Sequence, residues 1–262
     1  MPPRLSVLPA IALSLIVGAC AKPPAPVVEV SGGCADALKA QVCTWARTQD
    51  STLVEVGATI PMASIENAPA VDQMVWPPAT AAVVDIPASA RRQSGFTNLT
   101  IYWEAMGHPP GPYMTPHFDF HFNTIANAER SAIDCKDEAR PAALADGYAL
   151  PDIPLPPDMA KMTGVPTLVG ICVPQMGMHS LLRAEMESKE PFRGSMVIGY
   201  YHAKPIFIEP MLTRAMLMEK KSFDLPIPTV PGLGAHPTKF HAEYDAAKQA
   251  YRFTFSGFGA AT

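Results

Sequence analysis

The sequence has few charged residues and lacks the patterns that bind phosphates. Charged side chains make up 17% of the 262 residues and the formal net charge is −4, so no excess of lysine and arginine is present to attract a polyanion. Neither a Gly-x-Gly-x-x-Gly run nor a P-loop pattern occurs, and there is no Gly-x-Ser-x-Gly nucleophile elbow. These absences argue against nucleic acid as a partner, against nucleotide binding and against serine-hydrolase chemistry.

Long apolar runs are absent after the first twenty residues. The run LPAIALSLIVGA follows Arg4, the only positive charge before it, and ends after Gly18 and Ala19. It is shorter than the ~20 residues that a transmembrane helix needs. We therefore interpret residues 1–19 as a targeting signal.

The residue that follows this signal is a cysteine in a small-residue setting. Val17-Gly18-Ala19-Cys20 resembles the lipobox of bacterial lipoproteins, in which the cysteine becomes the lipidated N-terminus. An ordinary cleaved signal with an incidental cysteine is the alternative. The lipobox interpretation predicts a membrane anchor at Cys20, a Pro-rich tether over residues 20–33, and, because Ala21 follows, a place on the periplasmic face of the outer membrane of the cell envelope.

Four cysteines remain after the signal: Cys34, Cys43, Cys135 and Cys172. In an oxidising compartment this even number fits two disulfides. Residues 35–48 have a helical pattern, and a helix of that span would hold Cys34 and Cys43 too far apart to bond. Either that helix begins late and Cys34 folds back, or the pairs differ; we favour Cys135 with Cys172, which flank one Pro-rich loop. Thiolate ligation of zinc is the alternative, but the close Cys-x-x-Cys spacing is missing.

Proline and glycine divide the chain into short segments. The 29 prolines and 17 glycines are scattered without a period, which favours a β-rich fold over long helices. We predict a single domain over residues 34–262, an antiparallel β-sandwich or barrel-like fold with two or three short helices. The expected strands are 51–61, 81–87, 98–107, 117–122, 167–173, 194–202 and 205–209, with a closing hairpin over 240–258. The expected helices are 35–48, 126–139 and 210–221.

One predicted strand carries most of the chemistry. In GHPPGPYMTPHFDFHFN, residues 107–123, His117, Asp119 and His121 alternate with three phenylalanines. Because successive side chains of a strand point to opposite faces, one face is aromatic and the other carries two imidazoles and a carboxylate. The alternative is an ordinary strand whose polar face lies in water.

Other residues extend this polar face into a candidate metal site. His179 follows a buried-looking strand, and Glu209 ends the apolar run IFIE, where an unpaired charge would be costly. We predict His117, His121 and His179 as nitrogen ligands, with Asp119 or Glu209 as the oxygen ligand or general base. This donor set suits zinc, iron, manganese or copper(II). The Pro-rich loop before the strand would hold His108 and Tyr113 near the mouth of the site.

The chemistry that such a site would perform stays open at this point. Three protein ligands leave a coordination position free, so an enzyme here would be a metal-dependent hydrolase or an oxidative enzyme acting on an unknown small molecule. Methionines at 211, 216 and 218 offer thioether ligands that would suit copper(I), although methionines on a helix are more typical of a core. The competing class is a non-catalytic structural or stress-induced assembly protein, whose polar cluster is a hydrogen-bond network that fixes loops.

Three motifs together resemble a known family. GHPPGPYMTPHFDFHF, VPQMGMHS and VIGYYHAKPIFIEPMLTRAML are similar to a family of exported prokaryotic domains of unknown function, typified by a thermophile protein under sigma-E and anti-sigma-E control. The similarity covers residues 54–217. It implies a mostly β domain, a possible ring-like homo-oligomer and no assigned activity. The motif positions that match are His108, His117, Asp119, His121, His179, Glu209 and Met211, whereas Ser180 departs from the aromatic residue expected there.

Overall fold

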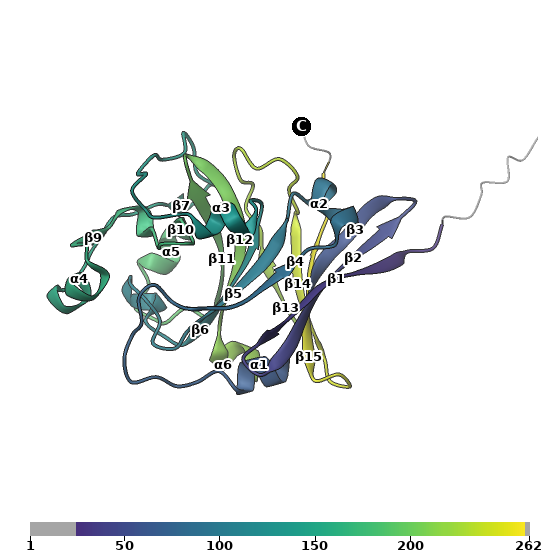
Figure 1. The fold of residues 1–262 in the computed structure, drawn as a ribbon, viewed down its shortest axis with the longest axis horizontal. Coiled ribbons are helices and arrows are strands. Elements are labelled where there is room, and N and C mark those ends of the chain that lie inside the picture. Colours follow the sequence, from purple (N-terminus) through teal and green to yellow (C-terminus); the bar gives the residue numbers. More distant parts are fainter. Residues whose placement is uncertain (1–24, 260–262) are drawn as a thin grey trace, which may run out of the picture.

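The fold is a sandwich of two antiparallel sheets (Figure 1). The computed structural model describes residues 25–259, so the predicted signal and Cys20 lie outside the described part. One sheet has six strands in the order β1-β2-β3-β15-β14-β13, and the other has seven in the order β4-β5-β6-β12-β11-β10-β7. Every strand pair is antiparallel, and within residues 25–259 neither sheet closes on itself. The predicted β-sandwich is confirmed.

The strands of the six-stranded sheet come from both ends of the chain. They are β1 (Val28–Ala37), β2 (Ala40–Gln49), β3 (Thr52–Pro61), β13 (Phe223–Pro226), β14 (Lys239–Asp245) and β15 (Ala250–Ser256). The seven-stranded sheet contains β4 (Thr80–Asp85), β5 (Asn98–Glu104), β6 (His117–Asn123), β7 (Tyr148–Ala149), β10 (Met178–Leu182), β11 (Gly194–Tyr201) and β12 (Lys204–Thr213). A small ribbon pairs β8 (Ile153–Pro154) with β9 (Thr167–Leu168). His202 and Ala203 form the turn between β11 and β12, and the predicted closing hairpin is β14–β15.

Helices are short and lie at the ends of strands. They are α1 (Met62–Glu66), α2 (Ala88–Ser94), α3 (Asn127–Ser131), α4 (Pro157–Thr163), α5 (Arg183–Met186) and α6 (Arg214–Met218), with 3-10 turns at Gly111–Tyr113 and Val169–Ile171. The described residues therefore have six short helices rather than two or three. None of these helices has the length and apolar character needed to cross a bilayer.

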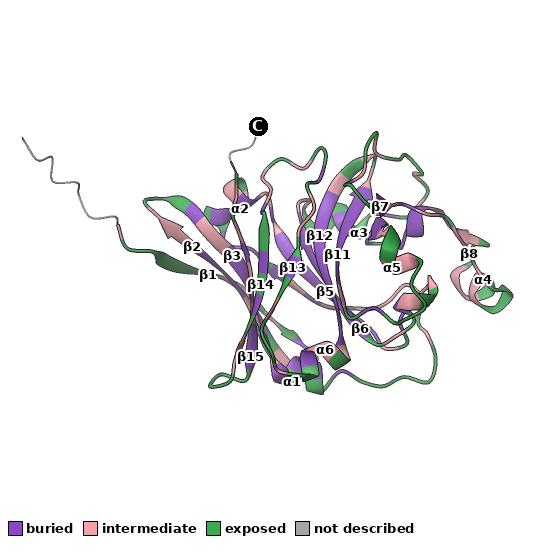
Figure 2. Ribbon diagram, turned by 180° about the vertical axis from the view of Figure 1, so that it is seen from behind, coloured by how far each residue is buried: buried purple, intermediate pink, exposed green. Residues whose placement is uncertain are grey.

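Aromatic side chains fill the space between the sheets. The Phe120 ring on β6 meets Phe253 on β15 edge to face, with centroids 5.0 Å apart, and Phe122 meets Phe255 in the same way at 4.8 Å. All four side chains are buried, and Figure 2 shows that buried residues concentrate in the strands at the centre of the molecule. The aromatic face predicted for residues 117–122 is thus the inner face of the sandwich.

The outer face of β6 is covered as well. All seven residues of β6 are buried. Part of the cover comes from the segments between the strands of residues 124–193, where Arg130 of α3 bonds to Tyr102 of β5 and Phe192 packs against His117. A solvent-exposed polar face is therefore excluded, and the histidines of β6 lie in a second, polar interior.

The helix predicted for residues 35–48 is wrong. This segment is the hairpin of β1 and β2, whose turn residues Leu38 and Lys39 have φ values of 50° and 71°. Such turns favour Asn, Asp and Gly, so the sequence carried no turn signal here. The register sets Cys34 directly opposite Cys43, and a disulfide joins them across the two strands with Cα atoms 4.1 Å apart.

The glycine pair of the predicted tether has a structural role instead. β1 begins at Val28, so residues 28–33 belong to the sheet. A Cβ added at Gly32 would lie 2.7 Å from Cδ of Pro87 and 2.9 Å from the carbonyl oxygen of Asp85. Only glycine permits this close approach, which brings the edge of the first sheet against β4 of the second.

Several predicted elements are shorter than expected. The helix predicted for 126–139 covers only Asn127–Ser131. Residues 167–173 form β9 and then a turn in which Gly170 has a φ of 58°, not one strand. The helix predicted for 210–221 covers only Arg214–Met218, because β12 continues through Pro210 to Thr213. The Thr213 hydroxyl accepts a hydrogen bond from the Met216 backbone N–H at 3.2 Å and begins the helix there.

The predicted disulfide between Cys135 and Cys172 is present, and we expect it to stabilise the domain more than the hairpin disulfide. The two bonds close segments of 37 and 9 residues. Because a disulfide restricts the unfolded chain, we expect the free energy of unfolding to fall by about 4 kcal/mol in Cys135→Ser/Cys172→Ser. In Cys34→Ser/Cys43→Ser it should fall by about 2.5 kcal/mol. Urea denaturation of the two double variants measures both; a larger loss for the hairpin pair would contradict this account.

Candidate metal centre

The strand register gathers polar side chains on the outer face of the seven-stranded sheet. Glu104 of β5 pairs with His117 of β6, and Tyr102 pairs with Asp119. On the other side of β6, Ile208 pairs with Phe122 and Met211 with Asp119, which sets Glu209 of β12 opposite His121. Alternation along three adjacent strands therefore produces one polar patch beneath residues 124–193.

Two groups of three residues in this patch have the composition of metal sites. The His121 group consists of His121, His179 and Glu209, and the His117 group consists of His108, His117 and Asp119. Within each group the candidate ligand atoms all lie within 4.8 Å of one another. Nε2 of His121 lies 3.3 Å from Oε2 of Glu209, and Nε2 of His117 lies 3.3 Å from Oδ1 of Asp119.

The structure thus divides the residues that the sequence placed around one ion. His121, His179 and Glu209 come together, whereas His117 lies with Asp119 and His108 in the second group. Successive residues of a strand rise by about 3.3 Å, so His117 and His121 are about 13 Å apart along β6. A single ion is too small to bind both imidazoles. Instead His117 lies beside Asp119, and His121 lies beside Glu209.

Three imidazoles are held in the orientation of metal ligands. Nδ1 of His108 donates to the Pro109 carbonyl at 2.8 Å, Nδ1 of His117 to the Thr115 carbonyl at 2.7 Å, and Nδ1 of His179 to the Ile171 carbonyl at 2.9 Å. Because a carbonyl oxygen only accepts, Nδ1 carries the proton in each ring. Nε2 then keeps its lone pair, which is the arrangement found around metal-bound histidines.

Several atoms of both groups are buried and have no hydrogen-bond partner among residues 25–259. They are Nε2 of His117, Oδ1 of Asp119, both ring nitrogens of His121, and Oε2 of Glu209. Buried polar atoms are paired in almost all proteins, so each unpaired atom needs an explanation. A cation bound between the imidazoles and the carboxylate of each group would satisfy the acceptors together.

Burial sets the protonation of the groups in the metal-free protein. Loss of solvation lowers the pKa values of His117 and His121 far below the usual range and lowers that of His179 to about 3. The same effect raises the pKa values of Asp119 and Glu209, whose carboxyl groups lie in hydrogen-bonding contact. Without metal, the imidazoles are therefore neutral, and burial favours the protonated form of both acids.

The carboxyl contact also joins the two groups into one centre. A cavity of about 20 Å³ lies beside it, with Glu104, His108, Asp119 and His179 in its wall. This volume suffices for about one water molecule or one ion. Within the described part of the chain the Glu104 carboxyl group has no hydrogen-bonding partner, and burial raises its pKa to about 9.

An aromatic ring fixes the position of His121. Phe207 stacks on the imidazole with centroids 4.0 Å apart and an interplanar angle of 17°. Gly199 makes room for this ring, because a Cβ there would lie 1.9 Å from Cε1 of Phe207. Gly199 is also the residue with which His179 pairs across β10 and β11.

We expect Gly199→Ala to lower both stability and metal affinity. The added methyl group must displace Phe207, an overpacking cost of about 1–3 kcal/mol, and the displaced ring no longer holds His121. Urea denaturation and zinc titration measure the two effects. Gly234→Ala is the matched control, since no heavy atom of the described residues lies within 4 Å of its Cβ position. Equal stability and equal zinc affinity of the two variants would contradict the role of Gly199.

Tyr113 is buried beside His108 and does not line an opening to solvent, contrary to the expectation from the sequence. Its side chain is fully buried and its hydroxyl donates to Oε2 of Glu185 at 3.1 Å. The ring stacks beside His108, with centroids 6.1 Å apart, and packs against Phe192, which also touches His117. The Pro-rich loop therefore positions His108 by burying Tyr113.

Sequence reasoning missed a buried cation above the polar patch. Arg130 of α3 donates to the Tyr102 hydroxyl at 2.8 Å and to the Gln175 carbonyl at 2.7 Å, and is almost fully buried. Tyr102 in turn packs against His121, with centroids 5.0 Å apart. Tyr102 and Glu104 alternate with apolar residues along β5, but this alternation gives no sign that their face of the strand is covered.

The remaining histidines and the methionines lie elsewhere. His202 is in the β11–β12 turn beside Asp137, and His241 is exposed and contacts Asp224 at 2.8 Å. Met211 is buried on β12 rather than on a helix, and Met218 is exposed on α6.

We compared the chain with protein-family models, with curated proteins and with solved structures. None of the three comparisons gave a match.

Proposed function

We propose that this domain is a metal-binding protein in which the His121 group and the His117 group each hold one divalent transition-metal ion. The observation that carries the proposal is the state of the ligand atoms. In both groups, buried imidazole and carboxylate atoms face one another without partners. In three of the four histidines, the second ring nitrogen is already bonded to the backbone.

The donor atoms favour particular metals. Each group offers two imidazoles and one carboxylate, and Cys34, Cys43, Cys135 and Cys172 are occupied in disulfides. Nitrogen and oxygen donors without thiolate suit zinc, iron, manganese or copper(II). Three protein ligands leave a coordination position for water or a substrate, which supports a hydrolytic or oxidative reaction.

A purely structural polar network fits the same residues less well. Such a network stabilises loops when its members are paired, and partly satisfied networks destabilise a core. Here the unpaired atoms include the nitrogen and oxygen atoms of His117 and Asp119, and of His121 and Glu209, that face each other, whereas Nδ1 of His108, His117 and His179 is bonded to a backbone carbonyl. That distribution supports a cation between the ligands.

Metal analysis of the purified protein tests the proposal. We expect zinc-saturated wild-type protein to contain two ions per chain, and His179→Ala and His108→Ala to contain one each, because each variant removes a ligand from one group. His241→Ala, which alters an exposed histidine, should keep both ions. Equal metal content in all four proteins would end the ligand assignment.

We also propose that the domain is an exported lipoprotein anchored to the cell envelope through Cys20. Two disulfides support an oxidising compartment outside the cytoplasm. Residues 17–20 support lipid attachment. We expect Cys20→Ala to move the protein from the membrane fraction to the soluble fraction and to abolish labelling by radioactive palmitate. Unchanged membrane association and labelling would contradict the anchor.

A further inference from the structure

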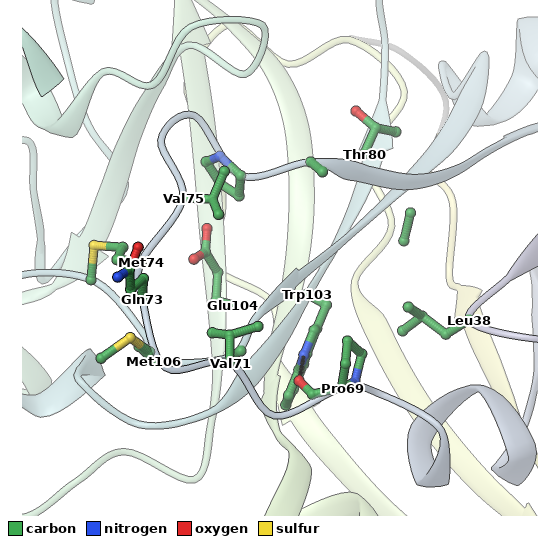
Figure 3. A pocket seen from close by; sticks show the side chains of 14 residues that line it. Leu38, Pro69, Val71, Gln73, Met74, Val75, Thr80, Trp103, Glu104 and Met106 are labelled. Carbon is green, nitrogen blue, oxygen red and sulfur yellow. Dashed lines mark hydrogen bonds between the residues drawn. The ribbon is translucent and has the colours of Figure 1, made fainter. Parts of the chain in front are cut away.

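An apolar pocket lies directly beside the centre. It has a volume of about 240 Å³ and is bounded by the loop of residues 69–79 and the end of β5 (Figure 3). Its wall includes Val71, Met74, Val75, Trp103 and Met106. Val71, Val75 and Met106 keep 42%, 64% and 39% of their surface exposed, so the mouth of the pocket presents unpartnered apolar side chains.

The shape of the pocket is fixed by a hydrogen bond. Nε1 of Trp103 donates to the Pro69 carbonyl at 2.7 Å, which holds the indole against the start of the loop. The indole ring of Trp103 also packs against Phe118 of the core, with ring centroids 4.5 Å apart. The pocket floor therefore belongs to the rigid sandwich.

The pocket and the metal centre share a wall. Glu104 lines the pocket and also lines the small cavity that His108, Asp119 and His179 surround. The loop contributes adjacent residues to both spaces, Val75 to the pocket and Trp76 to the cavity. Figure 3 shows the Glu104 carboxyl group pointing from β5 toward Val75.

The lining chemistry restricts the ligand. Of the residues in the wall, Gln73, Thr80 and Glu104 are polar and none is Lys, Arg or His. An anionic ligand would have no cation to pair with, and burying an unpaired charge costs far more than burying a neutral hydroxyl. A hydroxyl group can both donate to and accept from a carboxyl group.

We propose that this pocket binds a small uncharged alcohol or phenol, whose apolar body fills the space under residues 69–79 and whose hydroxyl group hydrogen-bonds to Glu104. A dry cavity of about 150 Å³ holds benzene, so this pocket has room for a body roughly the size of naphthalene. Binding in the pocket needs no metal. The role of the pocket in bringing the hydroxyl group to the metal centre rests on the proposed function.

Titration of metal-free protein with 2-naphthol, followed by the fluorescence of the ligand, tests the pocket. We expect saturable binding, with 2-naphthoate and naphthalene as competitors weaker by about tenfold or more. Val75→Lys should weaken 2-naphthol binding by about tenfold, because it places a long charged side chain at the mouth. Val165→Lys is the matched control on an exposed valine outside the pocket.

Two outcomes would overturn the pocket assignment. One is equal binding of 2-naphthol by the Val75→Lys and Val165→Lys variants. The other is binding of 2-naphthoate as tight as that of 2-naphthol. Glu104→Leu adds a second measure, since it should remove the preference for 2-naphthol over naphthalene, whereas Glu104→Gln should keep it.

The same titration with zinc-loaded protein tests the link to the centre. We expect zinc to tighten 2-naphthol binding by about threefold or more and to leave naphthalene binding unchanged, because only the hydroxyl group reaches the centre. No effect of bound zinc would overturn the link and leave the pocket standing. Failure of zinc to bind at all would refute the proposed function, while the metal-free titration would still decide the pocket.

Discussion

The double variant Asp119→Asn/Glu209→Gln should fold as well as the wild type without metal and gain nothing from zinc. Burial raises the pKa values of both carboxyl groups, so neutral amides of the same shape resemble their metal-free state. Amides are poor ligands for zinc, and each group would lose its carboxylate. In the wild type, zinc at about 1,000 times its dissociation constant should stabilise the fold by about 4 kcal/mol for each of the two ions.

Thermal unfolding with and without zinc measures this difference. The exposed Asp224, which contacts His241, provides the control, and Asp224→Asn should respond to zinc as the wild type does. A double variant that zinc still stabilises fully would remove both carboxylates from the ligand set. A double variant that fails to fold without metal would show that the acids are structural.

Phe120→Ala should cause the largest loss of stability of any single substitution considered for this chain. The Phe120 side chain is fully buried and packs on Phe253 of the opposite sheet and on Phe118 of its own strand. Removal of a buried phenylalanine ring costs about 3–5 kcal/mol through lost burial and the cavity that remains.

Urea denaturation of the metal-free protein gives the loss directly. Met114→Ala, at a side chain that is 47% exposed, should change the stability by less than about 0.5 kcal/mol. Because Phe120 lies between Asp119 and His121, the variant should also weaken zinc binding. A loss below about 1 kcal/mol would mean that the aromatic face of β6 does not hold the sheets together.

The faces of β6 could be predicted from the sequence because alternation is a local property of a strand. Phe118, Phe120 and Phe122 do point into the sandwich, and His117, Asp119 and His121 share the other face. The burial of that second face could not be predicted in the same way. Its cover is a mostly irregular segment, residues 124–193, whose docking depends on contacts such as that of Arg130 with Tyr102.

The grouping of the ligands depends on register, which the sequence does not reveal. Only the pairing of β12 with β6 sets Glu209 opposite His121, and only the Pro-rich loop brings His108 back to His117. The first hairpin was missed for a different reason. Its turn uses Leu38 and Lys39 in the left-handed region, where neither residue type signals a turn.

A crystal structure of the zinc-soaked protein, with anomalous scattering collected at the zinc edge, would show whether each group binds an ion. We expect two anomalous peaks. One should lie about 2.0–2.2 Å from Nε2 of His179, a ring nitrogen of His121 and a Glu209 oxygen, and the other at the same distances from ligands in His108, His117 and Asp119. Data with no peak at either group would contradict the ligand assignment.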